Sequence, residues 1–169
     1  MTRNDPVLAE KVCLALVAEG PTHGWALSTL LAPDGEIGRI WSLSRPLAYR
    51  ALDQLVLDGL IEKVGTAPGG GRSRTLLEAT ELGASSNASW LEAPVALPKD
   101  VRTELLVKFT LRSRVGLPLD PLAADQRALF APLLNGSATA DGGDFVARWR
   151  REHLEAIDRF LSSFGTPNA

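Results

Sequence analysis

Side chains that could carry out chemistry are few in this chain of 169 residues. The imidazoles are His23 and His153, and neither stands at a spacing that would form a metal pair or a Ser-His-Asp arrangement. The single thiol, Cys13, has no flanking cation to activate it, so we expect it to be a small buried apolar residue. Glycines 69–71 lie between two short strand candidates, which favours a hairpin tip over a phosphate loop. The sequence therefore predicts neither an enzyme nor a bound metal or cofactor.

Positive charge, by contrast, is gathered in one stretch. Between residues 39 and 74 six basic residues stand against three acidic ones, although the whole chain has a net charge of -2. The total charge argues against a protein that coats nucleic acid by bulk attraction, but it leaves room for a local basic surface. Such a run can also be an ordinary solvated face, so its meaning depends on the elements that carry it.

Those elements have the order of a winged helix-turn-helix. Start signals, stop signals and apolar periodicity predict three helices, at about 6–19, 23–31 and 44–58. Asp5-Pro6 begins the first of them, Thr22 can cap the second, and Ser44 begins the third. Strand candidates at 60–64 and 74–79 then flank the glycine-rich turn. Basic residues would thus lie on the third helix and beside the tip of the hairpin, where DNA-binding proteins of this type need them.

The remainder of the chain is predicted to be helical. Thr80 can cap a helix to about residue 90, and Pro94 with Pro98 indicates a hinge. Helices at about 99–114, 120–135 and 144–164 follow, and the first of these is apolar on more than one face, so we expect it to be buried on two sides. We therefore predict a mainly α protein in two domains, 1–92 for DNA binding and 98–169 for dimerisation or effector binding.

The last helix carries an apolar stripe that has two interpretations. Apolar side chains at this spacing usually pack against a partner helix, which predicts a homodimer. Aromatic side chains could alternatively line a pocket for a small aromatic effector. The candidate residues for either role are Phe145, Trp149, His153, Ile157, Phe160 and Phe164.

Three segments also resemble a known family, the PadR-type transcriptional regulators. Gly20–Leu27 is similar to the start of the family's second helix, Ser44–Leu55 to its recognition helix, and Gly71–Gly83 to its second wing strand and the helix that follows. The chain departs from the pattern at Trp25, where a tyrosine is usual, and at Leu77, where the wing strand generally carries an aromatic residue. It also departs at Leu47-Ala48, where a threonine-leucine pair is usual. The resemblance covers about the first half of the chain.

This resemblance implies a homodimeric DNA-binding regulator, most often a repressor. Its two recognition helices would enter successive major grooves of a pseudo-palindromic double-stranded operator. Ser44 would cap the helix and contact phosphate, Arg45 would contact base edges or backbone, and Tyr49 would donate its hydroxyl to a phosphate. Arg50 would pair with the backbone or with Asp53, and the wing residues Arg72 and Arg74 would reach the adjacent minor groove or its phosphates.

Two other classes of function stay open at this level. The winged helix could serve protein-protein assembly without DNA, which would suit the acidic total charge, or the helical half could be the working part of a small-molecule binding protein. The chain has no run of 18 apolar residues and no segment of signal-peptide type near Met1, so we expect a cytoplasmic protein without a membrane partner.

Overall fold

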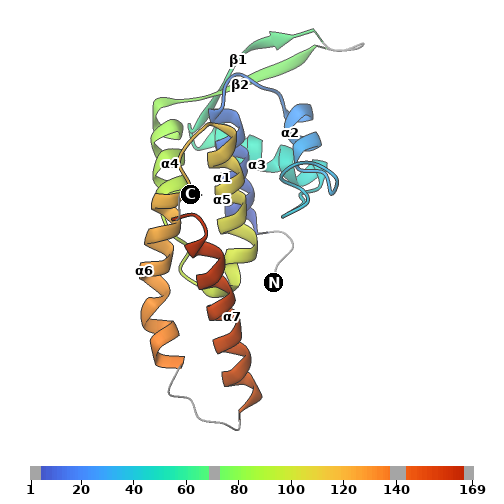
Figure 1. Ribbon diagram of the computed structural model, residues 1–169. Helices are drawn as coiled ribbons and strands as arrows, with labels where there is room; N and C mark the ends of the chain where they lie inside the picture. Colours follow the sequence, from blue (N-terminus) through green and yellow to red (C-terminus); the bar gives the residue numbers. More distant parts are fainter. Residues whose placement is uncertain (1–4, 69–72, 138–143, 166–169) are drawn as a thin grey trace.

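The computed structural model describes residues 5–68, 73–137 and 144–165. These residues form an elongated molecule with a hairpin wing at one end and a pair of antiparallel helices at the other (Figure 1). In chain order the elements are α1 (Pro6–Ala18), α2 (Gly24–Leu30), α3 (Arg45–Leu57), β1 (Ile61–Ala67), β2 (Arg74–Ala79), α4 (Glu81–Glu92), α5 (Leu106–Arg114), α6 (Asp120–Ser137) and α7 (Phe145–Ser162). The order of three helices, a hairpin and a helical tail confirms the predicted fold class.

Local signals in the sequence explain most helix starts. Asp5 caps α1, because its carboxylate accepts from the backbone N–H of Val7 at 3.0 Å, and Pro6 occupies the first turn. Thr80 caps α4 by accepting from the N–H of Gly83 at 3.1 Å. At the end of α3, Gly59 has a φ of 69°, a conformation that glycine adopts without strain, and the chain turns there into β1.

The predicted cap of α2 was wrong. His23, rather than Thr22, stands at the N-cap, and its Nδ1 accepts from the N–H of Ala26 at 3.1 Å. Thr22 is engaged elsewhere, because its backbone pairs in both directions with Leu77 of β2, at 3.0 and 2.7 Å. A bridge between residues so far apart in sequence pulls Thr22 into the sheet and shifts the helix start by one residue.

The wing is an antiparallel pair whose register shifts once. Lys63 pairs with Leu77 and Gly65 with Leu76, so Val64 is the extra residue of a bulge. β1 runs on to Ala67, three residues beyond the predicted strand. The predicted hairpin tip at 69–71 lies outside the described residues.

Helix α5 joins two hydrophobic cores, as its apolar faces predicted. Val107 and Leu111 pack into the core formed by α1 to α4 and the wing. Phe109, together with Leu105 just before α5, packs into a second core with α6 and α7. The predicted division at residues 92 and 98 stays a prediction, and the structure adds that α5 belongs to both cores. Before α5 the chain makes a 3-10 turn, Pro98–Asp100, and a π-helical turn, Val101–Leu105, where a regular helix from residue 99 was expected.

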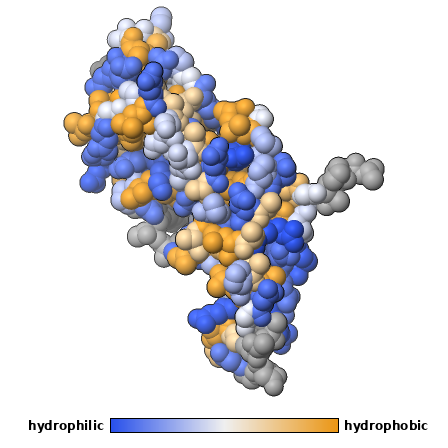
Figure 2. Space-filling view, turned by 90° about the vertical axis from the view of Figure 1, so that its left-hand side faces the viewer, coloured by the Kyte–Doolittle hydropathy of each residue, from blue (hydrophilic) through white to orange (hydrophobic). Residues whose placement is uncertain are grey.

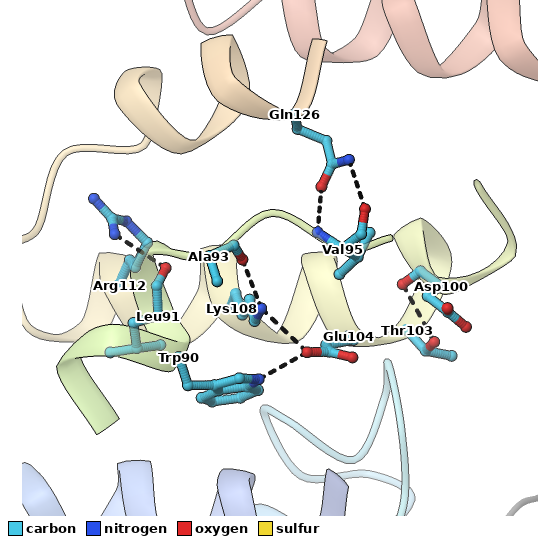
Figure 3. A network of polar contacts seen from close by, with 10 residues as sticks. All are labelled: Trp90, Leu91, Ala93, Val95, Asp100, Thr103, Glu104, Lys108, Arg112 and Gln126. Carbon is cyan, nitrogen blue, oxygen red and sulfur yellow. Dashed lines mark hydrogen bonds and ion pairs between the residues drawn. The ribbon is translucent and has the colours of Figure 1, made fainter. Parts of the chain in front are cut away.

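A buried polar network ties α4, the segment 93–98 and α5 together (Figure 3). The side chain of Lys108 is 1% exposed, and its Nζ donates to the carbonyl of Ala93 at 2.7 Å and lies 3.1 Å from the Glu104 carboxylate. The same carboxylate accepts from the indole N–H of Trp90 at 2.7 Å. Burial lowers the pKa of Lys108, and the charge of Glu104 opposes part of that shift.

Further bonds hold the segment that was expected to be a hinge. The side-chain amide of Gln126 bonds both backbone groups of Val95, at 2.7 and 2.9 Å. Arg112 donates to the carbonyls of Leu91 and Pro118. The expected hinge stays a prediction, and the structure adds that Ala93 and Val95 of this segment are bonded to α5 and α6.

The tail consists of α6 and α7, which lie side by side and point away from the wing (Figure 1). Asp144 caps α7, since its carboxylate accepts from the N–H of Val146 at 2.9 Å. Arg127 of α6 pairs with Asp158 of α7 at 2.8 Å. None of the described helices is both long enough and apolar enough to cross a membrane.

Candidate nucleic-acid interface

Helix α3 has one buried face and one exposed face. Its buried residues are Ala48, Ala51, Leu52 and Leu55, which pack into the first core. Arg45, Tyr49 and Arg50 lie on the exposed side, and Tyr49 is 38% exposed. The apolar periodicity of α3 thus turns its basic side chains to solvent, where they can meet a nucleic acid.

Tyr49 is held against the start of α2. A Cβ atom at Gly24 would stand 2.9 Å from the Tyr49 ring, so only glycine allows this approach. The guanidinium carbon of Arg45 lies 5.6 Å from the centroid of the same ring, within the range of a cation–π contact. The glycine of the second helix and the tyrosine of the third therefore form one packed unit that presents the phenol and Arg45 together.

On the wing, Arg74 is placed by two residues near the start of α2. Its guanidinium carbon lies 4.5 Å above the Trp25 ring, and its Nη1 lies 3.4 Å from Nε2 of His23. Trp25 is itself 47% exposed, so the indole forms a platform at the surface. The tryptophan at which this chain departs from the PadR pattern thus supports a cation of the wing.

These side chains surround one open concavity of about 650 Å³ between α2, α3 and the wing. We call this the reading surface, and its chemistry-bearing residues are His23, Trp25, Arg45, Tyr49, Asp53, Lys63 and Arg74. Three cations, Arg45, Lys63 and Arg74, face one carboxylate, Asp53, so the concavity is positive on balance.

Four cations of α3 and the wing have no acidic partner among the residues that the structure describes. Arg45, Arg50, Lys63 and Arg74 form no ion pair within 4.0 Å among residues 5–68, 73–137 and 144–165. In particular, the expected pair of Arg50 with Asp53 is not formed within the chain. These charges remain available to an external anion.

The structure places the other predicted DNA-contacting residues as follows. Ser44 stands at the N-cap of α3, but its hydroxyl makes no capping hydrogen bond, contrary to expectation. Arg72 lies outside the described residues. His23, Trp25 and Lys63 belong to the reading surface but were not among the predicted contacts. Their basic or aromatic character was visible in sequence, whereas the bridge that brings α2 to the wing was not.

The predicted dimer or effector residues of α7 separate into two groups. Phe145 and Trp149 are 82% and 67% exposed, and His153 stacks on Trp149 with ring centroids 5.8 Å apart. Ile157 is instead buried within the chain's own second core. Nearer the end of the helix, Phe160 and Phe164 pack against Phe109, although Phe160 is still 40% exposed. The beginning of α7 is therefore the part left uncovered.

A smaller cavity of about 230 Å³ lies between α6 and α7. Phe130 and Ile157 line it, and the Arg127–Asp158 pair contributes to its wall, whereas Phe145, Trp149 and Phe160 do not line it. From the side of α4 and α6, Figure 2 shows exposed apolar residues interrupted by polar ones. Of the residues predicted to line an effector pocket, Ile157 lines this cavity and the aromatic ones do not.

Elsewhere the structure offers little reactive chemistry. Cys13 is buried as expected, and burial, with the charge of Glu10, raises the pKa of its thiol to about 12. Among the described residues, no group of three or more His, Cys, Asp or Glu side chains is arranged to hold a metal ion.

The fold and the exposed basic concavity define a winged helix-turn-helix protein. No protein-family model and no curated protein matches the chain. Among solved structures, the chain is similar to three crystal structures of PadR from Bacillus subtilis. The complex with operator DNA is 20% identical, with a TM-score of 0.48, over 93% of this chain and 97% of that chain. The complex with p-coumaric acid is 19% identical, with a TM-score of 0.46, over 92% and 95%. A third structure of PadR is 17% identical, with a TM-score of 0.46, over 96% and 97%.

Proposed function

We propose that this protein is a cytoplasmic transcriptional regulator of the PadR type, which binds a pseudo-palindromic operator as a homodimer and acts as a repressor. The observation that carries the proposal is the reading surface, where Arg45, Lys63 and Arg74 face one concavity and form no ion pair with any residue that the structure describes. A protein surface that leaves several cations uncompensated in this way is suited to a polyanion.

In this proposal α3 enters the major groove. The groove is about 12 Å wide and admits one helix. Arg45, in the first turn of α3, would reach base edges or phosphates, and the Tyr49 hydroxyl would donate to a phosphate. Arg74 and Lys63 would contact the backbone beside the groove, because they lie on the wing at the other side of the concavity. Contacts with phosphates position the protein, and contacts with base edges read the sequence.

Dimerisation is assigned to the uncovered part of α7. Phe145 and Trp149 are exposed large apolar side chains on adjacent turns, and a second copy would bury them by two-fold symmetry. Half-sites would then lie about one helical turn of DNA apart, roughly 34 to 36 Å. The double variant Phe145→Ser with Trp149→Ser leaves Leu154, Ile157 and Leu161 in the core, so it tests the interface without removing the helix. We expect monomers in sedimentation velocity with unchanged helical content, and a variant that still dimerises would move the interface elsewhere.

The stacking of Trp149 on His153 supports a second interpretation, in which this part of α7 binds an aromatic effector. A planar aromatic acid bound there should quench tryptophan fluorescence and release the protein from DNA. The Trp149→Phe variant should lose the fluorescence response, while quenching that is unchanged in this variant would place the ligand elsewhere.

The direct test of DNA binding uses a labelled duplex from the region upstream of the gene that encodes this chain. We expect binding at nanomolar to sub-micromolar concentrations by fluorescence anisotropy, with an affinity that falls linearly with salt on logarithmic axes. Absent binding, or binding that salt does not change, would favour a winged helix used for protein assembly instead.

A further inference from the structure

We propose that His23 is a backbone-phosphate contact of the DNA-binding surface, acting as an uncharged hydrogen-bond donor through its Nε2–H beside Arg74. The inference rests on the proposed function and adds to it a residue, a donor atom and the group that receives the bond.

The first step concerns the tautomer of His23. A neutral imidazole has one N–H donor and one bare acceptor nitrogen. Nδ1 accepts from the backbone N–H of Ala26 at 3.1 Å, so it is the bare nitrogen and Nε2 carries the proton. The opposite tautomer would set two N–H groups against each other at the helix start, and a backbone N–H cannot move away as a long side chain can.

The second step concerns what lies opposite Nε2. The guanidinium of Arg74 lies there, with its Nη1 3.4 Å away. Arginine has only donors, so the N–H of Nε2 and the N–H groups of Arg74 cannot satisfy one another. Two donors side by side at a partly exposed site favour a shared acceptor between or above them, and one of the two donors is cationic. A phosphate oxygen meets both requirements.

The third step concerns rigidity. The backbone bridge between Thr22 and Leu77 fixes the residue before His23 to the strand that carries Arg74. The Trp25 ring, 4.5 Å from the guanidinium carbon, holds Arg74 from below. Both donors are therefore positioned before any ligand arrives, and both border the concavity that also contains Arg45 and Tyr49. Because little side-chain freedom is left to lose, the pair can contribute strongly to binding.

A neutral donor has a distinctive signature in binding data. Each cation that neutralises a phosphate steepens the salt dependence, with a slope change of about 0.9 on logarithmic axes. His23 should raise affinity without contributing to that slope, whereas Arg74 should contribute to both. A phosphate contact should also act equally on every DNA sequence, unlike a contact with a base edge.

Two substitutions separate the two nitrogens of the ring. In His23→Asn the side-chain oxygen takes the place of Nδ1 and keeps the cap, but nothing replaces the Nε2–H. In His23→Gln the amide N–H reaches the place of Nε2, but the cap is lost. Binding is measured by anisotropy on the upstream duplex and on a random-sequence duplex of equal length, at several salt concentrations, with melting temperatures recorded for each variant.

We expect His23→Asn to melt like the wild type and to bind both duplexes about tenfold more weakly, with an unchanged salt slope. His23→Gln should melt at a lower temperature but stay within about threefold of wild-type affinity, because the donor is preserved. As a reference, Arg74→Gln should lower the affinity and reduce the slope by about 0.9.

The inference is overturned if His23→Asn binds like the wild type, if its loss of affinity changes the salt slope, or if it affects only the upstream duplex. It is also overturned if the imidazole nitrogen signals of the free wild-type protein, recorded by NMR at the pH of the binding measurement, show the proton on Nδ1. If the wild type binds no duplex at all, the proposed function itself fails, and the two failures are thereby distinguishable.

Discussion

Cations are used in opposite ways on the reading surface and at the junction of the two cores. On the reading surface, Arg45, Lys63 and Arg74 border an open concavity and form no ion pair with the described residues. At the junction of the two cores, Lys108 and Arg112 are 1% and 5% exposed, and each donates to backbone carbonyls. The number of basic residues in a segment does not tell which of the two uses applies. The partners of each cation within the fold do tell.

The physical reason lies in the cost of burying charge. A cation taken out of water is tolerated only where carbonyls or a carboxylate replace its hydration, as they do around Lys108. When protein groups have taken the place of water around such a cation, its N–H donors are no longer available to a ligand. The exposed cations keep their hydration and their counterions, and the release of these counterions on binding can drive association with a polyanion.

The largest expected effect comes from breaking the junction at Lys108. Lys108→Met replaces the side chain by an unbranched one without a charge, so it removes the donor to the Ala93 carbonyl and the cation beside the Glu104 carboxylate. We expect a loss of about 2 to 4 kcal/mol in the free energy of unfolding by urea denaturation, toward the low end for buried pairs because Glu104 is 26% exposed. Lys99→Met, on a side chain 74% exposed, is the control and should change stability by less than about 0.5 kcal/mol.

A second test of the junction uses pH. Because burial lowers the pKa of Lys108 below its ordinary value of 10.5, the native protein releases this proton at lower pH than the unfolded chain does. Between the two values the unfolded state binds more protons, so the contribution of Lys108 to the free energy of unfolding rises with pH. The wild type should therefore gain stability relative to Lys108→Met as pH approaches 10.5. A difference that stays constant or shrinks would contradict the assignment.

At the reading surface the expected effect is on binding rather than folding. Arg45→Ala should weaken duplex binding about tenfold, because a charge-assisted contact contributes about 1.5 kcal/mol, and should leave the melting temperature unchanged since the side chain is exposed. Gln54→Ala is a matched control on the same helix, because that side chain bonds Asp58 at 2.9 Å and does not line the concavity. If the two variants changed duplex affinity equally, Arg45 would not be part of the interface.

The smallest expected effect is that of the Tyr49 hydroxyl. Tyr49→Phe keeps the ring against Gly24 and removes only the O–H donor. We expect affinity for DNA to fall about two- to fivefold, since the net contribution of one hydrogen bond from a neutral hydroxyl is about 0.5 to 1 kcal/mol. An unchanged affinity would mean that the ring serves packing alone.

The features predicted correctly from the sequence are those that local signals specify, namely helix starts and the exposed face of α3. Caps and prolines at Asp5 and Thr80 located helix starts closely, and the apolar period of α3 predicted that its basic residues face solvent. The sequence could not predict long-range pairing. The bridge of Thr22 with Leu77 made the expected cap wrong and brought His23 and Trp25 to Arg74, two contacts that no spacing reveals. Periodicity likewise marked the apolar stripe of α7 but could not show that α6 covers Ile157 and leaves Phe145 exposed.

The central claim is that Arg45, Lys63 and Arg74, which form no ion pair with the described residues, are available to pair with phosphates. The most direct measurement is the slope of log affinity against log salt for the wild type and for a variant in which Arg45, Lys63 and Arg74 are all changed to Gln. The account predicts that the slope falls by about 2 to 3, since each cation contributes about 0.9, while Lys99→Gln leaves it unchanged. A triple variant with the wild-type slope would contradict it.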